Sequence, residues 1–116
     1  MTIMKIIQVA FYGDDGGKEP VREWLKKLGK PDSTIIGEDL KTVEFGWPIG
    51  MPTCRPLGGG LYEVRSEISS HRIARVLFCF ADGYMVLLHG FIKKTQETPD
   101  KELKLARDRK RKVENG

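Results

Sequence analysis

Cysteine and histidine are scarce in this chain, which has two of each among its 116 residues. Cys54 and Cys79 lie far apart, and together with His71 and His89 they show none of the close spacings typical of zinc sites. We therefore expect no metal and no other cofactor. We also expect Cys79, which lies in an apolar run, to be a reduced and buried thiol in a cytoplasmic protein.

Long apolar runs are missing as well. No stretch approaches the roughly 18 residues that a membrane-spanning helix needs, so we expect no contact with a membrane. The N-terminal run 1–11 is too short and too strand-like for a signal peptide. The sequence also lacks repeats and linkers, and we expect a single domain that spans residues 1–116.

Acidic residues are outnumbered by basic ones, 16 against 20, which gives a net charge of +4 and a pI of about 9.1. Such a balance favours an anionic partner, although charge alone identifies no particular one. The apolar and charged fractions, 40% and 31%, are those of a globular domain rather than of a disordered chain.

The most informative stretch is Leu61 to Lys94, where three apolar-rich runs are separated by two short polar breaks. One break contains Asp82-Gly83, and Asp-Gly between apolar runs is the strongest short hairpin signal. The pattern predicts an antiparallel meander with strands at Leu61–Ile68, His71–Phe80 and Tyr84–Ile92.

Other elements precede and follow the meander. We expect a first strand at Ile3–Phe11, a helix from Pro20 to Leu28, and a second helix that begins at Asp32 or Ser33 as N-cap and ends at Gly46. Residues 48–60, rich in proline and glycine, should be irregular. A last helix should begin at Thr98 as N-cap. The order β-α-α-β-β-β-α predicts an α+β fold with two N-terminal helices packed on one face of the sheet and a C-terminal helix.

Basic residues within the meander are the candidates for chemistry. Side chains alternate across a sheet, so Ala74, Val76, Phe78 and Phe80 should face the first two helices. Arg75 should then point to the opposite face, together with Arg65 of the strand before. In the last strand we expect Leu87, His89, Phe91 and Lys93 to share one face. If the registers agree, Arg65, Arg75 and Lys93 or Lys94 converge, and such cations could hold a phosphodiester backbone.

These residues also have ordinary structural explanations. Arg65 could form a surface ion pair with Glu63 or Glu67, and such pairs contribute little to stability. His71 and His89 lie in different strands without an evident carboxylate partner, so no catalytic triad can be assigned. The basic end of the last helix could be a solvated surface or could bind RNA.

Four sequence segments resemble those of RelE/HigB-type toxins of bacterial toxin–antitoxin systems, in the RelE/ParE superfamily and particularly its phage-derived HigB-like branch. They are Phe45-Gly46-Trp47-Pro48, Leu57 to Arg65, Arg72 to Phe78, and Leu87 to Pro99. The resemblance covers nearly all of the chain from Pro20 onward, and it implies a fold like that of small microbial RNases.

The resemblance implies an endoribonuclease that binds in the A site of the 70S ribosome, cuts mRNA without a metal and arrests translation. It implies a cognate helix-turn-helix antitoxin as partner. By position it assigns catalytic roles to Arg65, Arg75, Lys93 and Lys94. The tyrosine or histidine that some members place near the C-terminal helix is missing from 95–116, so the general acid or base stays unassigned, with His89 the nearest substitute.

We further expect RNA contacts from four residues: Arg72, His89, Arg55 and Arg107. The competing interpretation is a non-catalytic module that binds RNA or the ribosome, or a phage-borne inhibitor of a host protein. An enzyme requires its cations to surround one point, whereas a binding module requires only a spread basic surface.

Overall fold

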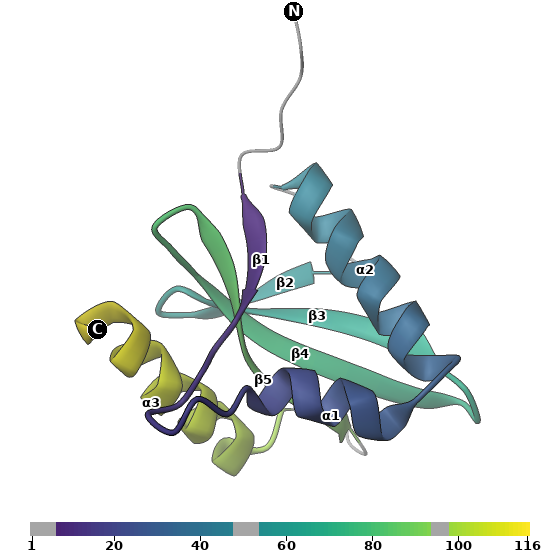
Figure 1. Ribbon diagram of the computed structural model, residues 1–116. Coiled ribbons are helices and arrows are strands. Elements are labelled where there is room, and N and C mark those ends of the chain that lie inside the picture. The colour runs from purple at the N-terminus through teal and green to yellow at the C-terminus, as the bar shows by residue number, and fades with distance from the viewer. Residues whose placement is uncertain (1–6, 48–53, 94–97) are drawn as a thin grey trace, which may run out of the picture.

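The computed structural model describes residues 7–47, 54–93 and 98–116, without the side chain of Lys93. In these residues, three helices and a five-stranded mixed sheet form three layers, so the predicted α+β class is confirmed (Figure 1). The elements are β1 (Gln8–Phe11), α1 (Pro20–Leu28), α2 (Asp32–Gly46), β2 (Cys54–Gly58), β3 (Leu61–Ile68), β4 (Arg72–Ala81), β5 (Tyr84–Lys93) and α3 (Asp100–Asn115).

The strands are ordered β1-β5-β4-β3-β2, with β1 parallel to β5 and all other neighbours antiparallel. The predicted meander is confirmed within one or two residues at each strand end, because its two breaks suit tight turns. Ser70, His71 and Asp82 all have positive φ, a conformation that Asp tolerates and that Gly83 adopts freely.

Helices α1 and α2 pack on one face of the sheet and enclose the first core. Val21 comes from α1, Ile36 and Val43 come from α2, and the expected inward residues of β4, including Phe78, meet them. The ring of Trp24 lies on Gly90 of β5 so closely that a Cβ atom at Gly90 would be 2.4 Å from two ring carbons. The absence of a side chain at Gly90 therefore lets α1 approach the sheet.

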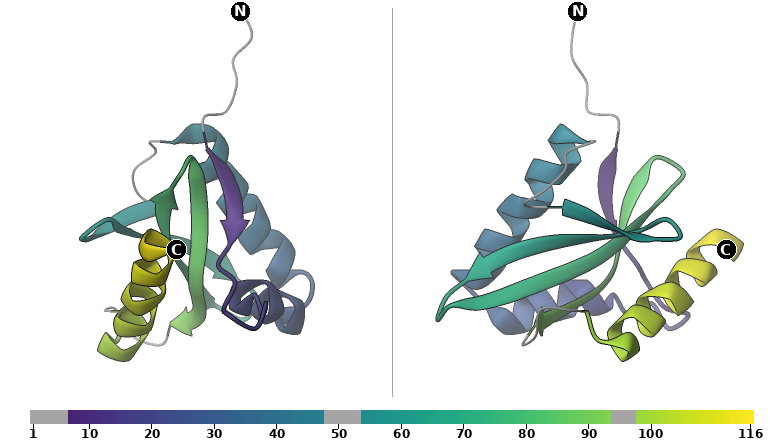
Figure 2. Two further views of the ribbon diagram at one scale, coloured as in Figure 1. Left: turned by 60° about the vertical axis from the view of Figure 1, so that its left-hand side comes forward. Right: turned by 180° about the vertical axis from the view of Figure 1, so that it is seen from behind.

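Helix α3 covers the opposite face of the sheet, as the two views in Figure 2 show. The second core lies beneath it and contains Leu61, Leu77, Leu88 and Phe91 of the sheet together with Ala106 of α3. Both cysteines are buried and free. Burial and the carboxylate of Glu63 raise the pKa of Cys54 to about 11, so its thiol stays protonated at neutral pH.

The prediction of irregular structure at 48–60 is wrong over its second half. Residues 48–53 lie outside the described residues, but Cys54–Gly58 form the edge strand β2. This strand is antiparallel to β3, and the pairing ends with Gly58 opposite Leu61. An edge strand tolerates Pro56 because one side of its backbone needs no partner. Gly58, Gly59 and Gly60 all have positive φ and make the turn into β3.

The predicted helix starts are also corrected. Pro31 and Pro99 occupy the N-cap positions, and neither cap makes a side-chain hydrogen bond. Asp32 and Thr98 instead use their side chains in tertiary contacts, described below, and these contacts outweigh a local cap. The first strand begins at Gln8, and the predicted part at residues 3–6 lies outside the described residues.

The face assignment for β5 is corrected at Leu87. The register of β4 and β5 shifts between Leu77, which faces His89, and Phe78, which faces Leu87. Leu88 is thus the extra residue of a β-bulge, and such a residue breaks the alternation of faces. Leu87 packs in the first core, whereas Leu88 and Phe91 pack in the second core beneath α3.

Candidate functional site

A row of side chains crosses four strands on the face that α3 covers. Arg55 of β2 pairs with Glu63 of β3, Glu63 pairs with Leu77 of β4, and Leu77 pairs with His89 of β5. The adjacent row contains Arg65, Arg75 and Phe91 in the same strand order from β3 to β5. Side chains two residues apart share a face of the sheet, so both rows point toward α3.

Glu63 is the centre of this arrangement, and its side chain is fully buried. Nη1 of Arg75 donates a hydrogen bond to its Oε1, and Nε of Arg55 donates to the same oxygen at 2.9 Å. The hydroxyl of Thr98, just before α3, donates to Oε2 at 2.9 Å. Two guanidinium groups and a hydroxyl therefore compensate a carboxylate that would be very costly to bury alone.

Arg75 is buried as well, with 7% of its side chain exposed, because α3 covers the face of the sheet opposite α1 and α2. Its Nε is buried and has no hydrogen-bond partner among the described residues. The Cα atoms of Arg65 and Arg75 face each other across β3 and β4, and Arg65 is exposed. Like charges in such a pair repel each other. Glu63 neutralises Arg75, but no described residue forms an ion pair with Arg65.

His89 has a carboxylate partner that sequence reasoning missed. Its Nε2 lies 3.1 Å from Oε1 of Glu102 in α3, and its ring stacks on Phe91 at a centroid distance of 5.5 Å. Burial lowers the pKa of His89, the contact with Glu102 opposes this shift, and Arg109 adds to it. One signal was present in the sequence: Glu102 precedes the apolar position Ala106 by four residues, which places it on the inward face of α3.

Two of the four expected RNA contacts lie away from these rows. Arg72 donates to Oδ2 of Asp32 at 2.6 Å and so ties the β3–β4 hairpin to α2. Asp32 also accepts from the backbone and hydroxyl of Ser69. Arg107 donates to the carbonyl oxygens of Leu57 and Gly58 and ties α3 to the β2–β3 turn.

Arg55 and His89 lie in the row itself. Lys93 is the last residue of β5, with its Cα opposite Ile73, whereas its side chain and all of Lys94 lie outside the described residues.

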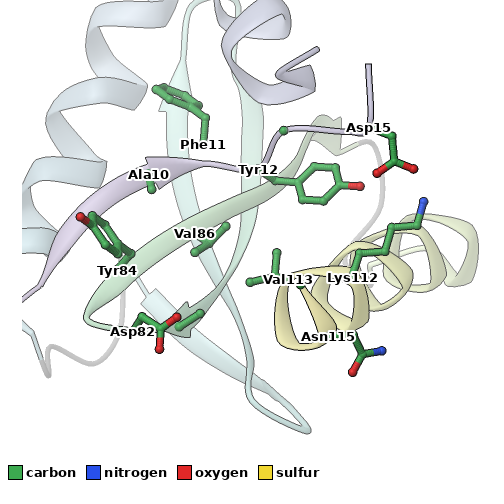
Figure 3. Close-up of a pocket in the computed structure, with 13 residues that line it drawn as sticks. Ala10, Phe11, Tyr12, Asp15, Asp82, Tyr84, Val86, Lys112, Val113 and Asn115 are labelled. Atoms are coloured by element: carbon green, nitrogen blue, oxygen red, sulfur yellow. The ribbon is translucent and has the colours of Figure 1, made fainter. Parts of the chain in front are cut away.

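A cavity of about 690 Å³ lies at the C-terminal end of α3, away from Arg55, Arg65 and Arg75. Figure 3 shows Tyr12 and Val86 beside Lys112 and Val113 there, between β1, β5 and the C-terminal turns of α3. Within the described residues, no three of the side chains of His, Cys, Asp and Glu are grouped closely enough to hold a metal ion. No helix in that part of the chain is long and apolar enough to cross a membrane.

Comparison with known families adds to this geometry. Residues 23–111, more than half of the chain, match the family described as Phage derived protein Gp49-like (DUF891). The chain belongs to this family. The Gp49-like proteins are a family similar to RelE toxins. No curated protein matches the chain. The matched range begins in α1 and ends in α3, so it includes every residue of the two rows in this Gp49-like chain.

Proposed function

We propose that this chain is the toxin of a toxin–antitoxin system, an endoribonuclease of the RelE/HigB type that cuts mRNA on translating ribosomes. The observation that carries the proposal is the cationic cluster on the α3 face, made of Arg55 and Arg75, which bind Glu63, and of Arg65 in the adjacent row. The family match supports the toxin-like class. A partner antitoxin follows from that class, because a toxin persists only when it is neutralised.

The proposed reaction is attack of a ribose 2′-hydroxyl on the adjacent phosphorus, with a 5′-hydroxyl and a cyclic phosphate as products. Negative charge grows on the phosphate oxygens, and a fixed cation stabilises it. Arg65 is exposed and forms no ion pair with any described residue, so it is the residue of the cluster that would bind the phosphate directly. Arg75 and Arg55 are held by Glu63, so they would contribute mainly their positive field. Lys93 and Lys94 remain proposed contributors by their position after β5.

A non-catalytic RNA- or ribosome-binding module is the alternative, and the burial of Arg75 favours it. A guanidinium that is 7% exposed and bound to a carboxylate cannot reach a phosphate unless the Glu63 contact opens. A binding module would need only exposed cations such as Arg65 and the outer residues of α3. The two functions differ in their products, because only the enzyme generates new 5′ ends.

The deciding experiment is induced expression of the chain with mapping of mRNA 5′ ends, in wild type and in Arg65→Ala. Arg65 is exposed and forms no ion pair with any described residue, so its removal should leave the fold intact. We expect growth arrest and new 5′-hydroxyl ends in wild type, and a loss of about 10²-fold or more in cleavage for Arg65→Ala. Arg22→Ala, an exposed arginine of α1, is the matched control and should cleave like wild type.

The partner is tested in the same cells by co-expression of each neighbouring gene. We expect one neighbour to restore growth and to copurify with the chain. Growth arrest without new 5′ ends would support the binding module, and normal growth at high expression of a folded chain would exclude both forms of toxin.

A further inference from the structure

The proposed reaction needs a group that removes the proton of the 2′-hydroxyl, and the arginine cluster holds none. Arginine stays protonated in proteins, and the carboxylate of Glu63 is enclosed by its three partners. His89 is the neighbouring group that titrates near neutral pH. It lies on the same face as Phe91, about 7 Å along β5, and Phe91 faces Arg75.

Two side-chain contacts hold the ring of His89. Glu102 approaches its Nε2, Phe91 stacks on its face, and Leu77 of β4 lies opposite it. Helix α3 is in turn anchored next to it, because Nη1 of Arg109 donates to the carbonyl oxygen of Leu88 at 2.8 Å. The side chains of His89 and Glu102 keep 15% and 17% of their surface exposed, so the pair is mostly buried but still accessible to solvent.

The first turn of α3 and Thr98, which precedes its N-cap, join this pair to the arginine cluster. Thr98 bonds to Glu63, and Glu102, one helical turn later, bonds to His89. Glu63 and His89 belong to one row, separated only by Leu77. One helix end therefore holds both the carboxylate that organises the arginines and the carboxylate that orients the histidine.

We propose that His89 is the general base of the cleavage reaction and that Glu102 is the positioning residue that orients its ring. This inference rests on the proposed function and supplies the base that the function requires. A carboxylate can only accept a hydrogen bond, so the hydrogen of neutral His89 resides on Nε2 and Nδ1 is left to accept a proton. The same division of roles between a histidine and a carboxylate operates in serine hydrolases.

Nδ1 of His89 takes the proton of the 2′-hydroxyl while the O2′–P bond forms. The P–O5′ bond breaks with its electron pair on O5′, which takes a proton from a solvent water. The imidazolium of His89 then returns its proton to the hydroxide that remains. The products are the 2′,3′-cyclic phosphate and the 5′-hydroxyl, and no oxidant or metal takes part.

The surroundings of His89 determine the pH dependence. The charged groups that face it are Glu102 and Arg109 of α3, with Glu63 one strand beyond Leu77 and Arg75 in the next row. Burial makes the largest contribution and lowers the pKa of His89, so the base is neutral at physiological pH. Cleavage should therefore rise with pH and become constant above the pKa of His89.

The test is single-turnover cleavage of a defined message on ribosomes, as a function of pH. We expect His89→Asn to lose about 10²–10⁴-fold in rate together with the pH-dependent limb. His71→Asn is the matched control: His71 is exposed in the β3–β4 turn at a positive φ that asparagine tolerates, and its variant should behave like wild type.

Glu102→Gln separates positioning from simple packing. Because Glu102 raises the pKa of His89, its loss should move the pH limb to lower pH and slow the reaction on the plateau. NMR titration of the ring should show the same downward shift at His89 and none at His71. Glu114→Gln, an exposed carboxylate of α3 that pairs with Lys110, is the control and should change neither readout.

The outcomes distinguish the inference from the function on which it rests. If wild type cleaves and a folded His89→Asn cleaves at the same rate and with the same pH profile, His89 is not the base and the proposed ribonuclease stands. If His89→Asn does not fold, the Glu102→Gln profile decides, and an unmoved pH limb overturns the inference. If wild type produces no 5′-hydroxyl ends at all, the proposed function fails and the inference fails with it.

Discussion

Replacement of Arg75 by methionine should destabilise the domain far more than a surface arginine substitution does. Arg75 and Glu63 are 7% and 0% exposed, and they form an ion pair between neighbouring strands beneath α3. Arg75→Met keeps the length of the side chain but removes one of the two positive charges that compensate Glu63. The sequence pattern placed Arg75 on the face opposite the first two helices, but α3 covers that face and buries the side chain.

The magnitude follows from the partners that Glu63 retains. Breaking a buried ion pair on one side costs about 3–5 kcal/mol, because the other charge stays buried without compensation. Arg55 and Thr98 still bond to Glu63 in the variant, and Arg55 is 38% exposed and thus well hydrated. We therefore expect the lower end of the range, about 3 kcal/mol of unfolding free energy.

Urea denaturation of wild type, Arg75→Met, Glu63→Met and the double variant measures this cost. A loss of about 3 kcal/mol moves the midpoint by roughly 1–3 M urea. Arg75→Met leaves Glu63 with only part of its compensation, and Glu63→Met leaves Arg75 buried without its anion. The double variant removes both buried charges and should recover most of the loss. A loss below about 1 kcal/mol for Arg75→Met, or two strictly additive losses, would refute the assignment of Arg75 and Glu63 as a coupled buried pair.

Two further outcomes check the fold around the site. Gly90→Ala should lose about 1–3 kcal/mol of unfolding free energy in the same denaturation assay, because its Cβ would lie 2.4 Å from the Trp24 ring. Gly37→Ala in α2 is the control and should gain stability, because open space surrounds that position. Equal effects of the two substitutions would contradict the close packing of Trp24 on Gly90. The backbone N–H of Ser69 is the main cause that lowers the pKa of Asp32 in the folded state. The stability that this carboxylate contributes is therefore present above the pKa of Asp32 in the unfolded state, and it is lost as pH falls through the pKa in the folded state. Asp32→Asn should then show a weaker decrease of stability with falling pH below about pH 4. A stability curve for Asp32→Asn that runs parallel to that of wild type would count against this contact.

Local signals in the sequence determined the strands of the meander and the first two helices. The Asp82-Gly83 turn sets the β4–β5 hairpin. Pro20 and Gly29 bound α1 because proline suits a first helical turn and glycine readily adopts the positive φ at the end of the helix. The alternation of apolar residues in β4 correctly separated the two faces of that strand. These features depend on residues close together in the chain, and for that reason the sequence alone predicts them.

Contacts between distant segments decided the rest. Cys54–Gly58 became a strand only because β3 offered a free edge, and the bulge at Leu88 moved Leu87 to the opposite face from His89. The packing of α3 on the sheet buries Arg75 as the partner of Glu63, and it places Glu102 beside His89. A strand pattern gives the face on which a side chain lies, but the element that covers that face, and so the solvation and partners of its charges, is fixed only by tertiary packing.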